Sequence, residues 1–170
     1  MGWSSHHPVG LIHYSPQQCY RGYNLPTNAR GSNDAFLMDM EGRICHRWHS
    51  DEGIGYAHLL PYGNLLIRTA APDDAGGAEK IGGSSAAILE LDWDSNVVWE
   101  TRFPLLHHDF HRTDAGTTLA LAWETLPKEL ADTINGAYHD DGPDPDMWGD
   151  KVVEIAQDGS VLNTWNAWEH

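Results

Sequence analysis

The chain has 170 residues, of which 41% are hydrophobic and 21% are charged, a composition typical of one globular domain rather than a disordered segment. It contains 10 basic and 25 acidic residues, which gives a net charge of −15. This balance argues against a nucleic-acid partner and against docking on an anionic membrane, because both need a basic surface. No stretch approaches 18 apolar residues, so we expect no membrane-spanning segment.

The N-terminus carries no basic region followed by an apolar run, so we expect no signal peptide and predict a cytoplasmic protein. The two cysteines, Cys19 and Cys45, form neither a disulfide framework nor a Cys-x-x-Cys metal motif, and we interpret both as small apolar side chains. Residues 1–34 are predicted to form an N-terminal arm with short strands at 11–14 and 22–25.

Three later segments share one pattern: an apolar run, a short acidic or glycine-containing turn, and a second apolar run, which is typical of a β-hairpin. They are residues 36–48, 88–101 and 152–165. A second hairpin pattern occurs at 56–66 and again at 109–119. Three pairs of residues are separated by the same 53 positions, namely Gly42 and Ser95, His58 and His111, and Gly63 and Gly116.

Two hairpins supply four strands, which is one blade of a β-propeller, and a repeat near 50 residues fits such blades. The sequence therefore predicts an all-β fold, a partial β-propeller of about two and a half four-stranded blades. Their ranges are about 35–70, 86–124 and 151–170, the last incomplete. Because propellers have about four to eight blades, this arc cannot close. The sequence is either a fragment of a longer chain or is completed by another chain, and we expect a second, different chain to complete it.

Three further segments are expected to connect these hairpins. Residues 72–85 form a glycine-rich loop, and residues 126–134 have the apolar spacing of a helix, with Pro127 suited to its first turn. Residues 135–150 form a long acidic loop that carries His139 and several aspartates. We interpret this loop as solvated, with a lid or a weak cation site as the alternative.

A cluster of polar side chains at residues 107–111 is the strongest candidate for a catalytic site. It contains His107, His108, Asp109 and His111. In an extended strand, His107, Asp109 and His111 would point to one face and His108 and Phe110 to the other. A carboxylate beside an imidazole fixes its tautomer and raises its basicity, so the cluster could supply a nucleophile, a general base or a metal ligand. The alternative is a solvated strand end.

Other candidates depend on the repeat or on the chemistry of single side chains. His58, the repeat mate of His111, is a candidate for substrate binding, or else a histidine bonded to backbone within a blade. Trp123 and Trp148, with Trp93 as a further candidate, could line a pocket for a small aromatic substrate. We also predict that Trp48 and Trp165 pack between blades, and that His108 and His170 hold a divalent metal such as zinc or calcium. Residues 168–170 are either a frayed terminus or the junction with the partner chain.

The runs DMEGRICHRW, HLLPYGNLL, ILELDWDSNVVWE, HHDFHRTDAGTTLAL, MWGD and AWEH resemble the arylsulfotransferase-like β-propeller family. The resemblance extends from about Gly10 to His170 and covers the first part of the family's propeller. It implies that residues 107–111 enter an innermost strand beside the channel, and that later blades add further channel histidines. It also implies sulfuryl transfer through a histidine nucleophile.

Three functions are compatible with these features. The leading one is a subunit of a split-chain propeller enzyme that hydrolyses an aryl ether, such as a nitroanisole, or an aryl ester, with water activated by His and Asp or by a His-bound metal. We prefer it because the family's sulfotransferases are exported, whereas no export signal is expected here. The alternatives are an arylsulfate sulfotransferase with a histidine nucleophile and a non-catalytic binding platform.

Overall fold

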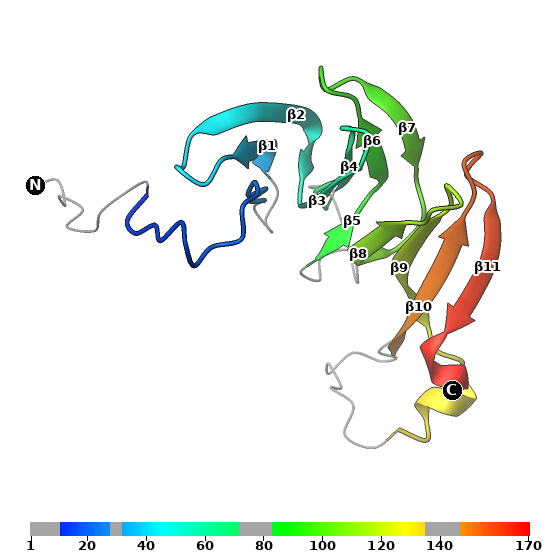
Figure 1. The fold of residues 1–170 in the computed structure, drawn as a ribbon. Coiled ribbons are helices and arrows are strands. Elements are labelled where there is room, and N and C mark those ends of the chain that lie inside the picture. The colour runs from blue at the N-terminus through cyan, green and yellow to red at the C-terminus, as the bar shows by residue number, and fades with distance from the viewer. Residues whose placement is uncertain (1–10, 28–31, 72–82, 135–146) are drawn as a thin grey trace, which may run out of the picture.

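The computed structural model describes residues 11–27, 32–71, 83–134 and 147–170 and confirms the all-β prediction (Figure 1). The described strands are β1 (Ser32–Met38), β2 (Ile44–Ile54), β3 (Tyr56–Leu59), β4 (Leu65–Arg68), β5 (Ser84–Ser85), β6 (Ile88–Leu91), β7 (Val97–Thr101), β8 (Leu106–Arg112), β9 (Thr118–Thr125), β10 (Trp148–Ile155) and β11 (Val161–Asn166). The helical elements are α1 (Lys128–Ala131) and a 3-10 turn, η2 (Ala167–Glu169). Within the described ranges, no helix is long and apolar enough to cross a bilayer.

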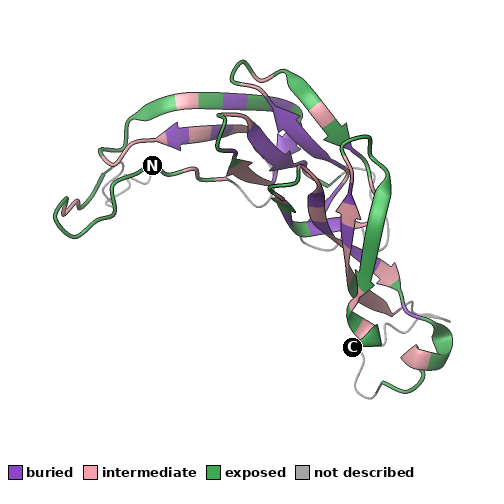
Figure 2. Cartoon of the chain, turned by 45° about the vertical axis from the view of Figure 1, so that its right-hand side comes forward, coloured by how far each residue is buried: buried purple, intermediate pink, exposed green. Residues whose placement is uncertain are grey.

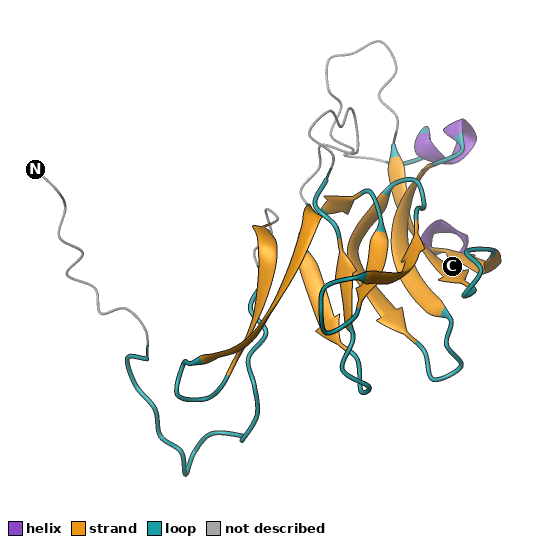
Figure 3. Ribbon diagram, turned by 90° about the horizontal axis from the view of Figure 1, so that it is seen from above, coloured by secondary structure: helices purple, strands orange, loops and turns teal. Residues whose placement is uncertain are grey.

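The strands form three antiparallel sheets that follow one another round an arc. The first sheet is β1-β2, the second is β3-β4-β6-β7, and the third is β5-β8-β9-β10-β11. Strands β2, β7 and β11 lie on the convex side of the arc, and β3, β5 and β8 lie on the concave side (Figure 1). Figure 3 shows the same sheets from above, with residues 11–27 beside the first sheet. This arrangement is compatible with part of a β-propeller.

The sheets begin half a repeat later than the blade ranges expected from the sequence. The hairpin β3–β4 pairs through β4 with β6 of the next hairpin, and β9 pairs in the same way with β10. Residues 35–70 therefore contribute to two sheets, and residues 151–166 complete the third sheet rather than begin another. The reason is that outer and inner hairpins alternate, so the repeat defines a period of 53 residues but not where each sheet starts.

Two local predictions differ from the structure. Residues 11–14 form no strand, and the 22–25 segment makes only one bridge, between Asn24 and Met38. The helix expected over 126–134 contains only Lys128–Ala131, with Pro127 at its N-cap and Asp132 at its C-cap. It buries no residue, and a single turn without a packed face has little intrinsic stability.

One turn type joins the five regular hairpins in the described part of the chain. In the turn between β3 and β4, Leu60 N donates to Asn64 O at 2.8 Å, and Gly63 N donates to Leu60 O at 2.9 Å. The fourth residue of each turn has a positive φ, between 70° and 98°, at Gly42, Gly63, Ser95, Gly116 and Gly159. Because glycine adopts this conformation without steric cost, the geometry accounts for the glycines that mark the repeat.

The apolar residues form two cores, each between a pair of neighbouring sheets (Figure 2). The first core joins Ala35, Leu37, Trp48 and Ile54 of the first sheet to Leu65, Ile67, Leu89 and Leu91 of the second. The second core joins Leu66 and Ile88 of the second sheet to Leu106, Phe110, Ala120, Val153 and Ile155 of the third. Since successive side chains alternate between faces, β4 and β6 are buried on both sides, and this stacks the three sheets.

A buried ion pair links the second and third sheets, and removing its charge should destabilise the fold. Arg112 donates to Glu90 at 2.9 Å and lies over the ring of Trp99. Substitution Glu90→Gln leaves the guanidinium buried without a counter-ion, so we expect a loss of about 3 kcal/mol in the free energy of unfolding. Urea denaturation measures it. The matched substitution Glu52→Gln, which breaks an exposed pair with Arg102, should cost less than about 1 kcal/mol.

Candidate functional site

The predicted cluster lies in a β-bulge on the concave side of the arc. Leu106 pairs with Ala122 and Phe110 pairs with Ala120, so residues 107–109 stand opposite the single residue Leu121. At the centre of the bulge, His108 has a φ of 50° and donates its backbone N–H to Gly83 O at 2.8 Å. Backbone strain of this kind is concentrated at functional sites.

The bulge overturns the predicted alternation of side chains. His107 and Phe110 are both buried, whereas His108, Asp109 and His111 are exposed. The extra residues in β8 shift the side-chain parity, so that His107 no longer shares a face with Asp109. The four predicted catalytic residues are therefore divided between one buried imidazole and three exposed side chains.

His107 connects the exposed His108 on β8 to the carboxylate of Asp150 on β10, which lies beyond β9 in the same sheet. Its ring is 3% exposed and stacks on Trp123, with 4.2 Å between the ring centroids. Its Nδ1 lies 3.0 Å from Nδ1 of His108, and its Nε2 lies 3.4 Å from Oδ1 of Asp150. That Nε2 makes no hydrogen bond to any described residue, so the approach to Asp150 is an electrostatic contact.

Burial lowers the pKa of His107, and it outweighs the opposing effect of the Asp150 carboxylate. The imidazole is therefore neutral at pH 7. The carboxylate favours a proton on Nε2 of His107, which leaves Nδ1 as an acceptor for Nδ1–H of His108. In that assignment, Nε2 of His108 keeps its lone pair and can act as a base or a nucleophile.

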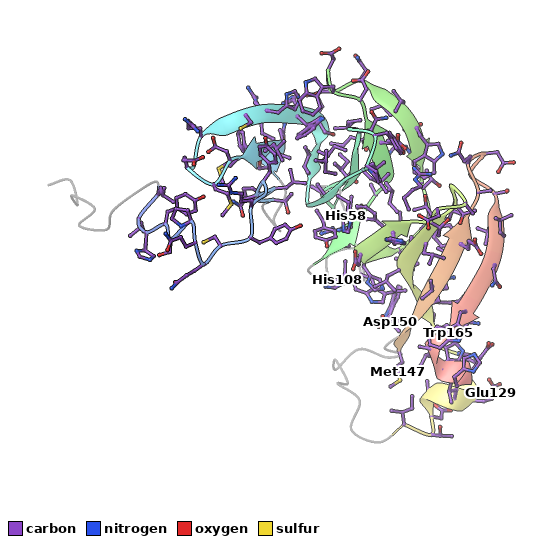
Figure 4. The ribbon with its side chains drawn as sticks, viewed as in Figure 1. His58, His108, Glu129, Met147, Asp150 and Trp165 are labelled. Atoms are coloured by element: carbon purple, nitrogen blue, oxygen red, sulfur yellow. The ribbon has the colours of Figure 1, made fainter. Side chains whose placement is uncertain are left out.

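His58 and Asp109 approach each other across the boundary between the second and third sheets. His58 Nε2 bonds to the hydroxyl of Tyr56 at 3.0 Å and lies 3.9 Å from Asp109 Oδ1. Its partner is a side chain, so the alternative of a backbone-bonded histidine does not hold. His111 does not face this contact. It lines an open hollow on the face of the third sheet that points away from the second core, and Asp109 also borders this hollow. Figure 4 shows His58, His108 and Asp150 along the concave side.

Arg68 and Asp150 are site residues that were not among the predicted ones. The Arg68 guanidinium is buried, donates to Ser84 O at 2.9 Å, and has its pKa lowered by that burial against the opposing charge of Asp109. The sequence signal that could have identified Arg68 is a single arginine directly after the apolar run 65–67.

Asp150 was assigned to the acidic loop, of which residues 135–146, with His139, lie outside the described residues. The proposed lid or cation site is thus not described by this structure.

The tryptophans fall into different environments. Trp123 stacks on His107 and forms an aromatic wall of the site, whereas Trp148 is partly buried at the start of β10, opposite Thr125. Trp93 stacks on His46 in the outer hairpins, away from the site. Of the predicted substrate-binding tryptophans, Trp123 is therefore the one that contacts the histidine cluster.

The two predicted metal ligands are not brought together. His170 stacks on Trp165, which Figure 4 places at the far end of the third sheet from His108. Among residues 11–27, 32–71, 83–134 and 147–170, no group of three or more His, Cys, Asp or Glu side chains is arranged to hold a metal ion. A bound divalent metal stays a prediction.

The lowered pKa of His107 gives a pH dependence of stability with a definite sign. The unfolded chain binds a proton at this residue near pH 6.5, whereas the folded chain binds it only at lower pH. His107 therefore contributes full stability above about pH 6.5 and loses it as the pH falls through the folded pKa, at up to about 1.4 kcal/mol per pH unit. Urea denaturation from pH 5 to 8 should show this slope in the wild type and a smaller one in His107→Phe.

Comparison with known proteins leaves the family open. No protein-family model matches the chain, and no curated protein is significantly similar to it.

Proposed function

We propose that this chain is a subunit of a split-chain β-propeller enzyme that hydrolyses an aryl–oxygen bond of a small aromatic substrate. The observation that carries the proposal is the line of contacts from Asp150 through buried His107 to exposed His108, at a strained bulge. A buried neutral imidazole between a carboxylate and a second imidazole is a means of fixing the protonation of the outer one.

In this proposal, His108 is the general base. Its Nε2 takes a proton from water, and the positive charge that develops is stabilised through Nδ1 by His107 and by the carboxylate of Asp150. The resulting hydroxide attacks the ring carbon of an activated aryl ether or the acyl carbon of an aryl ester, and the alkoxide or phenolate leaves. The buried cation Arg68 and the aromatic wall of Trp123 would favour an anionic, aromatic species in the site.

The position of these groups supports a channel site completed by a second chain. β3, β5 and β8 lie on the concave side of the arc, where the innermost strands of a propeller surround its channel (Figure 1). We propose that a different polypeptide supplies the rest of the ring, as the arylsulfotransferase-like resemblance implies. The proposed compartment is the cytoplasm.

Substrate turnover by the purified complex tests the chemistry. Release of nitrophenol from nitroanisole or nitrophenyl acetate without an acceptor phenol would support hydrolysis. Turnover of nitrophenyl sulfate that depends on an added phenol would instead support the sulfotransferase, since the lone pair of His108 could also attack sulfur. A complex that binds these compounds without turning any of them over would support a binding platform.

A further inference from the structure

The face of the third sheet that points away from the second core exposes side chains whose repeat mates are buried. Leu119 matches Leu66 at the 53-residue offset, and Val152 matches Ile88 at the offset that relates Gly159 to Ser95. Leu66 and Ile88 are fully buried under the third sheet, whereas Leu119 and Val152 are partly exposed.

These residues form a continuous surface, which we call the free face: His111, Leu119, Leu121, Val152 and Trp165. The pairings place them together, because His111 is opposite Leu119, and Val152 is opposite both Leu121 and Trp165. Asp109, His111, Leu119, Leu121 and Val152 line the hollow on this surface. The free face is thus apolar at its centre and polar toward the concave side.

Tryptophans show how each sheet is joined to the next at the convex side. The indole Nε1 of Trp48 in the first sheet donates to Asp92 O at 3.1 Å, in the outer turn of the second sheet. The indole of Trp99 in the second sheet donates to Gln157 O at 2.8 Å, in the outer turn of the third. The same type of hydrogen bond therefore ties both pairs of neighbouring sheets.

Trp165 occupies the same repeat position in the third sheet that Trp48 occupies in the first. Their burial differs, because Trp48 is fully buried and Trp165 is 47% exposed. Within the described part of the chain its indole N–H has no acceptor, and its ring stacks on His170. A fourth sheet with the same outer turn would offer a backbone carbonyl at the corresponding place.

We infer that the free face binds a four-stranded sheet of a second, different polypeptide, and that a turn carbonyl of this sheet accepts the indole N–H of Trp165. The inference rests on the partner chain of the proposed function, not on its chemistry. A second copy of this chain is a poor occupant. Its exposed first sheet has only two described strands, both from an outer hairpin, and would leave the hollow uncovered. Two copies would also repel each other at a net charge of −15 each.

The partner sheet also contributes to the site. His58 approaches Asp109 of the next sheet at 3.9 Å, and its repeat mate His111 points into the hollow on the free face. The partner's innermost strand therefore places a side chain opposite His111, as β8 places Asp109 opposite His58. The site is incomplete without that strand.

Site-specific photocrosslinking in the native cells tests the interface. The photoreactive residue p-benzoylphenylalanine replaces Trp165 in a tagged copy of the chain, and Val98, an exposed residue of β7, is replaced in the control. We expect position 165 to crosslink to one other polypeptide, at a hairpin turn with glycine in its fourth position, and position 98 to give no such product. Crosslinks to a second copy, to another segment of the same chain, or equally at both positions would overturn the inference.

Affinity measurements on the isolated complex separate the hydrogen bond from the apolar contact. Trp165→Phe removes the indole N–H and shortens the ring but keeps an aromatic side chain, so the Kd for the crosslinked partner should rise about 3- to 10-fold. Trp165→Asp buries a charge at the interface and should raise the Kd at least about 100-fold. Val98→Asp should leave the Kd unchanged, and equal Kd values for all three variants would overturn the inference. A His108→Asn complex that assembles but has no altered turnover would refute the proposed chemistry alone.

Discussion

Turnover of the aryl substrate is expected to fall by about 10³-fold when His108 is replaced by asparagine, because the general base is lost. Asparagine is the suitable replacement here. His108 has a φ of 50°, a region that asparagine tolerates better than alanine, so the bulge should persist. The amide side chain cannot take a proton from water, and the effect should therefore appear in kcat rather than in KM.

Two further variants test whether the loss of kcat depends on the contacts that run from Asp150 through His107 to His108. Asp150→Asn removes the carboxylate near His107 and should lower kcat about 10- to 100-fold, since an outer partner tunes the base rather than serving as one. His46→Asn, at a histidine that bonds to Trp93 O and lies in the first sheet, should leave kcat unchanged. If His108→Asn retained more than about a tenth of the wild-type kcat, His108 would not be the base.

The hairpins were predictable because their turn imposes a residue type. Each regular turn needs a positive φ at its fourth position, and glycine supplies this at four of the five turns. Ser95 occupies the fifth, and its place was found only through the 53-residue offset from Gly42. The grouping of hairpins into sheets was not predictable in the same way, because β4 and β6 are apolar on both faces and their sequence therefore does not specify which neighbour they join.

The residues of the site were predictable as a cluster, but their orientation was not. The density of imidazoles at 107–111 identified the region, and the bulge then separated His107 from Asp109. Nothing in the local sequence marks a bulge that depends on Gly83, 25 positions earlier, accepting the N–H of His108. Asp150 is likewise brought to His107 by the pairing of β9 with β10, a long-range feature of the sheet.

Activity should also depend on the glycine at position 83, although it carries no reactive group. Gly83 has a φ of 93°, and a Cβ built on it would lie 2.5 Å from Nε2 of His108. A side chain there must displace the imidazole that we propose as the base. We therefore expect Gly83→Val to lower kcat by at least about 100-fold, because a displacement near 1 Å is enough for a loss of this size.

Gly63 provides the matched control for this substitution. It has a nearly identical φ of 98°, but a Cβ at this position would meet nothing within 4 Å. Gly63→Val and Gly83→Val should both lower the thermal unfolding midpoint, since a β-branched residue is strained at positive φ. Only Gly83→Val should abolish turnover. Equal losses of kcat in the two variants would mean that backbone strain, and not contact with His108, accounts for the effect.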